Sequence, residues 1–180
     1  MGGDTLITVV AIFLAAILMF VFPLMSISER NDDISLLSVQ TATVEFVDNI
    51  RSTGKITLDN YDKYIQTLSA TGNSYDIEMS VKVLDENPGK KGAETSVTKI
   101  GENIYYTIYT SQIEQELGIG KDSPTSTTKL LKEGDIVSVS VKNTNITIAQ
   151  MLKNFFYSIS GNDTYSIEAS HSGVVMTNGK

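Results

Sequence analysis

The chain has 180 residues, with 14 basic and 21 acidic side chains and a formal net charge of -7 when its one histidine is neutral. This length suits one compact domain, or a small domain with an anchor. The acidic balance argues against a nucleic-acid-binding protein, because phosphate contacts require a basic face. Cysteine is absent, which excludes disulfides, thiolate zinc sites and cysteine nucleophiles. We therefore expect a non-enzymatic protein without catalytic residues, bound metal or cofactor.

An uncharged apolar stretch begins the chain. No charged residue lies between Asp4 and Glu29, and residues 6–25 are interrupted only by one threonine and one proline. An α-helix of this length measures about 30 Å, the thickness of the hydrocarbon core of a bilayer. We predict a transmembrane or filament-core helix over residues 1–28. A cleaved signal peptide is the rival interpretation, but the stretch lacks a preceding basic residue and a good cleavage site.

The charges that flank this helix say little about its orientation. The positive-inside rule counts Lys and Arg, and the N-terminal side has neither. We expect a short N-terminus inside the bacterial cytoplasmic membrane and the C-terminal domain outside it.

The helix is predicted to continue beyond the apolar stretch. Residues 33–51 contain no glycine or proline, and Gly54 is the first stop signal. Apolar or small side chains recur near helical spacing at Ile34, Leu37, Thr41, Val44 and Val47, with Phe46 and Ile50 beside them. We predict an amphipathic helix extension over residues 29–54 that packs on the head. The whole helix has about 45 residues and a length of roughly 65–70 Å.

Residues 55–180 predict an extracytoplasmic α+β head domain. Helices are expected over residues 60–70, with Thr57 or Asp59 as the N-cap, over 112–117, ended by Gly118, and over 148–157. Strands are expected over 75–83, 103–110, 136–142 and 164–170, with 173–176 extending the last, and turns or loops over 87–92 and 119–128. This order favours an antiparallel sheet packed on the long helix.

Candidate chemical motifs are weak. Residues 118–121 partly resemble a P-loop, but the first glycine and the final Ser or Thr are missing. His171 follows a predicted strand and is either a proton-transfer group or a strand-end residue. The acidic pairs at 32–33 and 85–86 lack the spacing of a calcium loop, so we expect them to be solvated surface charges.

The N-terminus resembles the precursors of type IV pilins, which have a short leader that ends in glycine before an apolar helix. Cleavage after Gly3 makes Asp4 the first mature residue and Thr8 the fifth. In major pilins the fifth residue is a glutamate that pairs with a neighbour's N-terminal amine, and Thr8 lacks that charge. Removal of residues 1–3 and retention of Met1 are both open.

The C-terminal half carries a second resemblance. Residues 134–141 read GDIVSVSV, residues 145–152 read NITIAQML, and a closing strand over 165–170 reads YSIEAS. Together with the N-terminal helix, this order resembles the TadE-like minor pilins, or pseudopilins, of tight-adherence (Tad) type IV pilus systems. The resemblance covers about half of the chain. It implies a type IV pilin-like fold, a long N-terminal helix packed on a C-terminal antiparallel-sheet head.

Two functions fit this sequence. The first is a pilin-like subunit of an extracellular filament that assembles with itself or with other pilins through its apolar helix. Ala15 and Ala16 then allow close helix approach, and Pro23 kinks or unwinds the helix. A tolerated membrane-interface proline is the simpler interpretation of Pro23. The alternative function is a single-pass membrane-anchored accessory or binding domain of a secretion or conjugation apparatus.

Overall fold

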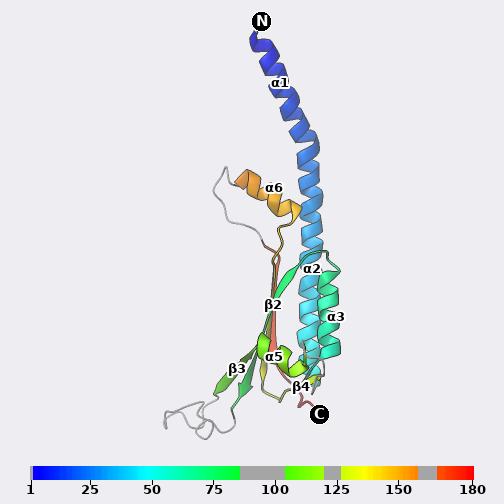
Figure 1. Cartoon of the computed structure of the whole chain (residues 1–180), viewed down its shortest axis with the longest axis vertical. Helices are drawn as coiled ribbons and strands as arrows, with labels where there is room; N and C mark the ends of the chain where they lie inside the picture. Colours follow the sequence, from blue (N-terminus) through cyan, green and yellow to red (C-terminus); the bar gives the residue numbers. More distant parts are fainter. Residues whose placement is uncertain (1, 86–103, 120–126, 158–165) are drawn as a thin grey trace.

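The computed structural model describes residues 2–85, 104–119, 127–157 and 166–180 (Figure 1). Helix α1 (Gly2–Ala16), the π-helical turn η1 (Ile17–Val21) and helix α2 (Phe22–Thr53) form one continuous helix. Its N-terminal part projects beyond the rest of the chain and leans away from the direction of α2 (Figure 1). The long N-terminal helix predicted from the sequence is confirmed.

The hydrogen-bond pattern of the helix changes immediately before Pro23. Proline has no N–H, so the carbonyl group four residues earlier cannot be paired in the usual α-helical way. The π turn over Ile17–Val21 lies at this point, and its wider pairing from residue i to i+5 lets the helix continue through the gap. The expected disturbance is therefore a π turn rather than an unwound segment.

Gly54 ends the long helix, as predicted. Its φ angle of 66° lies in the left-handed region, and its N–H donates a hydrogen bond of 2.8 Å to the Ile50 carbonyl. Glycine adopts this conformation without the steric cost that a side chain brings. The chain then turns back along α2.

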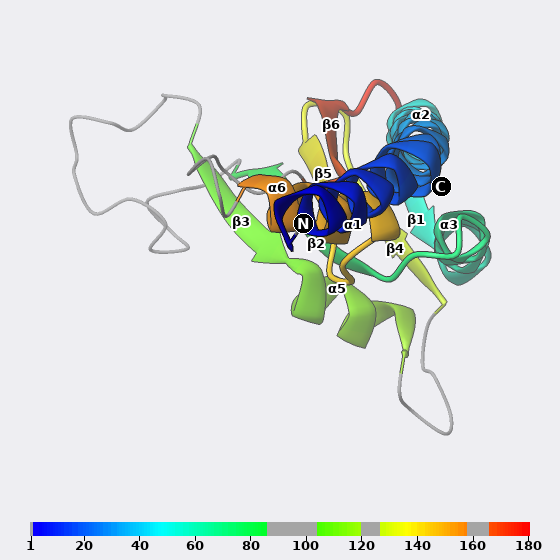
Figure 2. The ribbon, with the colours of Figure 1, turned by 90° about the horizontal axis from the view of Figure 1, so that it is seen from above.

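The head consists of short helices and two antiparallel sheets. Its elements, in chain order, are β1 (Lys55–Thr57), α3 (Leu58–Ser69), β2 (Tyr75–Leu84), β3 (Tyr105–Tyr109), α5 (Thr110–Leu117), β4 (Thr128–Leu130), β5 (Ile136–Asn143), α6 (Ile148–Tyr157) and β6 (Glu168–Val174). The larger sheet has the order β3-β2-β5-β6, and β1 pairs with β4. Figures 1 and 2 show α2 and α3 side by side along one face of the larger sheet. The predicted α+β class with an antiparallel sheet is confirmed.

The core lies between this sheet and the two helices. Alternation along the strands places one row of side chains inward, and the buried row includes Val81, Val137, Val139 and Val141. The helix over Leu58–Ser69 buries Tyr61, Tyr64 and Leu68. The Thr57 side chain, one of the two predicted N-caps, accepts from the Asn60 N–H. From α2, Phe46 stacks on Tyr64 with ring centroids 4.4 Å apart.

The predicted inner face of α2 is wrong in its first half. Ile34, Leu37, Thr41 and Val44 are exposed. The buried residues are Asp32, Ser35, Val39, Ala42, Thr43, Phe46, Val47 and Ile50. Small side chains at 42 and 43 allow α3 to approach closely, and polar ones at 32 and 35 meet polar partners. The head therefore packs on the less apolar face of this part of α2.

The smaller differences concern segments with weak sequence patterns. Strand β4 lies at the end of the predicted loop and pairs with β1, with Ile56 opposite Lys129. Both strands have only three residues, too few for a visible alternation. The predicted turn at 87–92 and most of the loop at 119–128 lie outside the described residues.

Candidate functional site

The exposed apolar helix is the first candidate site. Large side chains such as Leu6, Phe13 and Met19 are 67%, 68% and 71% exposed. Within the described residues, this is the one helix long and apolar enough to cross a membrane, and none of its most apolar part is buried against the rest of the chain. A surface of this size and composition requires lipid or protein around it.

The predicted packing residues all lie on this helix. Thr8, Ala15, Ala16 and Pro23 are exposed. Ala15 and Ala16 end α1, and Pro23 lies in the first turn of α2, so these three flank the π turn. The Thr8 hydroxyl donates a 2.7 Å hydrogen bond to the Asp4 carbonyl. The hydroxyl therefore has a partner within its own helix and needs none from a lipid or a neighbouring helix.

The predicted leader junction lies in the first turn of α1. Gly3 and Asp4 are exposed, and a Cβ atom added to Gly3 meets no atom within 4 Å. Cleavage between these residues stays a prediction.

A stripe of apolar side chains continues along α2. We call Ile27, Ile34, Leu37 and Val44 the outer stripe; their exposed fractions are 69%, 60%, 65% and 39%. The intervals of seven, three and seven residues match the a and d positions of a heptad repeat, the spacing of helices that pack side by side. Val44 lies about 25 Å farther along the helix than Ile27. The outer stripe thus extends well past Glu29, the first charged residue after the apolar stretch.

A buried polar cluster joins the start of α6 to α2. The Thr147 hydroxyl donates to Asp32 Oδ2 over 2.6 Å. The Thr147 N–H donates to Gln150 Oε1 over 3.1 Å, and the Gln150 N–H donates back to the Thr147 hydroxyl over 3.2 Å. Asp32 is 4% exposed, so the expectation of a solvated acidic pair is wrong at this position. Its burial is explained by this docked helix.

The sequence carries a local signal for this cluster at positions 147 and 150. A threonine followed three residues later by a glutamine is a capping box at a helix start. Lys153, one turn farther along α6, pairs with Glu29 at 3.2 Å.

The expectation of a solvated charge is also wrong at Asp85, which is 4% exposed. Its neighbour at position 86 lies outside the described residues. In the part that the structure describes, no three acidic or histidine side chains come together as a metal site.

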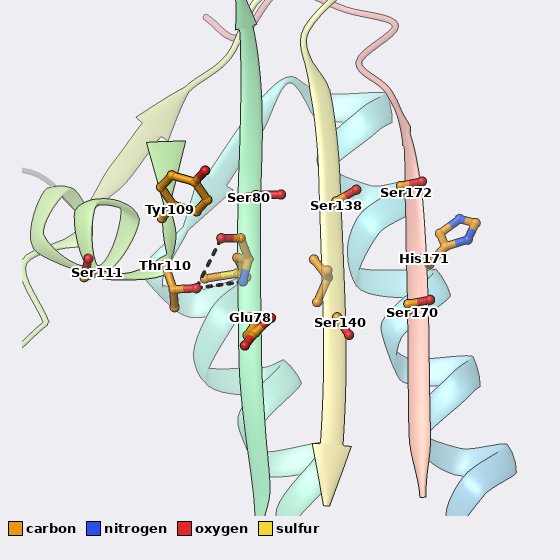
Figure 3. A pocket seen from close by; sticks show the side chains of 12 residues that line it. Glu78, Ser80, Tyr109, Thr110, Ser111, Ser138, Ser140, Ser170, His171 and Ser172 are labelled. Carbon is orange, nitrogen blue, oxygen red and sulfur yellow. Dashed lines mark hydrogen bonds between the residues drawn. The ribbon is translucent and has the colours of Figure 1, made fainter. Parts of the chain in front are cut away.

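The open face of the larger sheet carries a shallow hollow lined by hydroxyl groups (Figure 3). Ser80, Ser138 and Ser172 stand opposite one another across β2, β5 and β6, and Ser140 stands opposite Ser170. Thr110 is tied to β2, because its hydroxyl accepts from the Met79 N–H over 2.7 Å. This hollow can donate and accept hydrogen bonds.

His171 does not activate these serines. It lies within β6 rather than after a strand, so its predicted strand-end position is wrong. Its side chain points away from the serine rows (Figure 3). Its Nε2 atom lies 3.5 Å from Asp48 Oδ1 on α2, an ion-pair distance when the imidazole is charged. The pairing fits a role in holding β6 against α2.

Comparison with known proteins identifies no relative of this chain. No family model matches the chain, and neither the curated proteins nor the solved structures contain a match. The structure itself shows a long apolar N-terminal helix on an α+β head.

Proposed function

We propose that this chain is a non-enzymatic, pilin-like subunit that assembles into an extracellular filament of the Tad or type IV kind through its N-terminal helix. The outer stripe carries this proposal. A membrane accounts for exposed apolar side chains only as far as Ile27, because the charged residues that begin at Glu29 mark the end of the hydrocarbon region. Ile34, Leu37 and Val44 lie beyond that point, exposed on the side of α2 that faces away from the head.

The energetics favour covering this stripe with protein. Burying an isoleucine, leucine or valine side chain contributes about 1.5–3 kcal/mol. Three such side chains at heptad spacing offer a continuous seam for a neighbouring helix of the same kind. The seam continues the apolar surface of the membrane helix, so one neighbouring helix can cover both after the subunit leaves the bilayer.

The apolar helix suits both environments. Its backbone hydrogen bonds are satisfied within the helix, which lipid requires, and the Thr8 hydroxyl bonds to its own backbone. Ala15 and Ala16 have small side chains that permit close packing of neighbouring helices. The same helix can therefore reside in a membrane before assembly and in a protein bundle afterwards.

Replacing residues 6–25 with an unrelated apolar segment of equal length tests the proposal. We expect the exchanged chain to remain in the membrane with a folded head but to be lost from filaments, because the new surface does not match its neighbours. The amount of chain in filaments sheared from the cells is the readout. Normal incorporation contradicts the proposal and favours the anchored accessory domain, for which any membrane span suffices.

A further inference from the structure

Helix α6 projects sideways from the long helix at the level where the apolar stretch ends (Figure 1). Two contacts set this level. Lys153 pairs with Glu29 at 3.2 Å, and Thr147 donates to Asp32. Among the described elements, only α1, η1 and the start of α2 lie on the N-terminal side of α6 in Figure 1. This side of α6 therefore faces whatever surrounds the apolar helix.

The depth of α6 matches the headgroup region of a bilayer. Glu29 and Asp32 lie four and seven residues beyond Met25, the last residue of the 6–25 apolar stretch. These offsets correspond to about 6 and 10 Å along the helix. The headgroup region on each side of a bilayer is about 5–8 Å thick, and amphipathic helices in a membrane surface lie where it meets the acyl chains. With residues 6–25 in the hydrocarbon, the Glu29 contact lies within the headgroup region and the Asp32 contact lies at its outer edge.

One face of α6 is docked against α2, and the other is apolar and exposed. Ala149 and Gln150 are 1% and 6% exposed, on the side that meets α2. Ile148 and Met151, three residues apart on one helical face, are 59% and 61% exposed, and Ile146 just before the helix is 66% exposed. Three large apolar side chains within six residues form a patch that water does not favour.

The buried cluster holds this patch in a fixed direction. The hydrogen bond from Thr147 to Asp32 connects the start of α6 to α2, and two bonds between Thr147 and Gln150 hold Thr147 in place; all three are shielded from solvent. The start of α6 therefore cannot turn relative to the long helix unless these buried groups lose their partners, which is costly. The angle between α6 and the membrane-crossing helix is then set by the protein.

We propose that α6 is an interfacial helix, with Ile146, Ile148 and Met151 inserted among phospholipids while the subunit resides in the membrane. The proposal rests on the membrane-anchored stage of the proposed function. Lys153 already pairs with Glu29, and the chain is acidic overall. Binding by α6 therefore depends on apolar burial and requires no anionic lipid.

The absence of cysteine allows a direct test with single labels on the full chain. Three methionines of similar exposure serve as sites: Met151 on α6, Met19 in the apolar helix at 71%, and Met176 in the head at 57%. The Met176 N–H bonds to the Arg51 carbonyl, about 40 Å along the helix from Met25. The variants Met151→Cys, Met19→Cys and Met176→Cys carry a polarity-sensitive fluorophore in phosphatidylcholine vesicles with or without nitroxide-labelled lipid.

We expect labels at 151 and 19 to shift to shorter wavelength and to lose at least half of their emission to the nitroxide lipid, and the label at 176 to do neither. A label at 151 that behaves like the one at 176, while 19 is quenched, overturns the interfacial helix and leaves the anchor intact. A shift at 151 without nitroxide quenching identifies a protein contact and also overturns it. Failure of quenching at 19 contradicts the membrane anchor itself. Ile148→Cys provides a second site should Met151→Cys disturb the fold.

Discussion

Leu37 and Val39 lie two residues apart on α2 and on opposite sides of it: Leu37 is 65% exposed and Val39 is fully buried. Residues two positions apart on an α-helix are separated by about 200° around its axis, so one turn contributes to two opposite surfaces. Val39 packs in the head core, and Leu37 belongs to the outer stripe. The helix thus carries the head on one side and presents an apolar seam on the other.

Replacing Leu37 with aspartate is expected to block assembly without unfolding the head. A charge in the seam removes about 1.5–3 kcal/mol of apolar burial for each helix contact, which corresponds to at least a tenfold loss of incorporation. Exposed substitutions of this kind change the free energy of unfolding by less than about 1 kcal/mol. The chain in sheared filaments, relative to the membrane fraction, measures the effect.

Leu130→Asp is the matched control for this variant. Leu130 is also a leucine, is 57% exposed, and lies in β4, away from the outer stripe. We expect this variant to assemble at the normal level. If Leu37→Asp and Leu130→Asp enter filaments to the same extent, whatever that extent is, the outer stripe is not the basis of assembly.

Gly54→Ala is expected to destabilise the chain more than Gly72→Ala. Both glycines have positive φ angles, 66° and 79°, which cost a residue with a side chain about 1–2 kcal/mol. A Cβ atom at Gly54 also meets the backbone of Thr177 and Gly179, whereas at Gly72 it meets nothing within 4 Å. Overpacking of this kind costs a further 1–3 kcal/mol or so. Urea unfolding of the full chain in detergent measures both variants, and equal losses contradict the packing of the C-terminal residues on Gly54.

Tyr64 makes the stability of the head sensitive to alkaline pH. Burial raises its pKa to about 12, although the hydrogen bond with Thr43 lowers it. A neutral tyrosine is therefore favoured in the folded state, and this contribution is complete below pH 10. It is lost as the pH rises from 10 to 12, because the unfolded chain releases the proton first.

The variant Tyr64→Phe isolates the part of the alkaline loss of stability that is due to Tyr64. The variant loses the 3.0 Å hydrogen bond with Thr43, which costs about 1 kcal/mol at neutral pH, but its free energy of unfolding declines less between pH 10 and 12. Some decline remains, because burial and the hydrogen bond to Glu114 also raise the pKa of Tyr61. Parallel declines in the variant and the original chain contradict a buried, neutral Tyr64.

The sequence predicted the elements that depend on local pattern. The end of the long helix follows from Gly54, the start of α3 from the Thr57 cap, and β2 and β5 from strict alternation. The sequence did not identify the face of α2 that packs on the head, because this helix has two apolar faces. One face contains Leu37, and the other contains Val39 and Phe46. Helical spacing identifies both faces but does not say which one meets the sheet.

The candidate site was predicted only in its helical part. The apolar stretch, Pro23 and the small residues before it stand out in the sequence because they are contiguous. The Asp32–Thr147 contact joins residues 115 positions apart, and its acidic member has the appearance of an ordinary surface charge. Only the path of the chain through β5 brings the capped start of α6 to α2.

Fractionation of cells that produce the chain tests the central claim most directly. Filaments are sheared from the cell surface, and the chain is quantified in the sheared material and in the membranes. Assembly through the outer stripe predicts that the chain is present in high-molecular-weight sheared material and that Leu37→Asp removes it from that material. A chain that stays entirely in the membranes while filaments shear off contradicts the filament role and leaves a static, anchored domain.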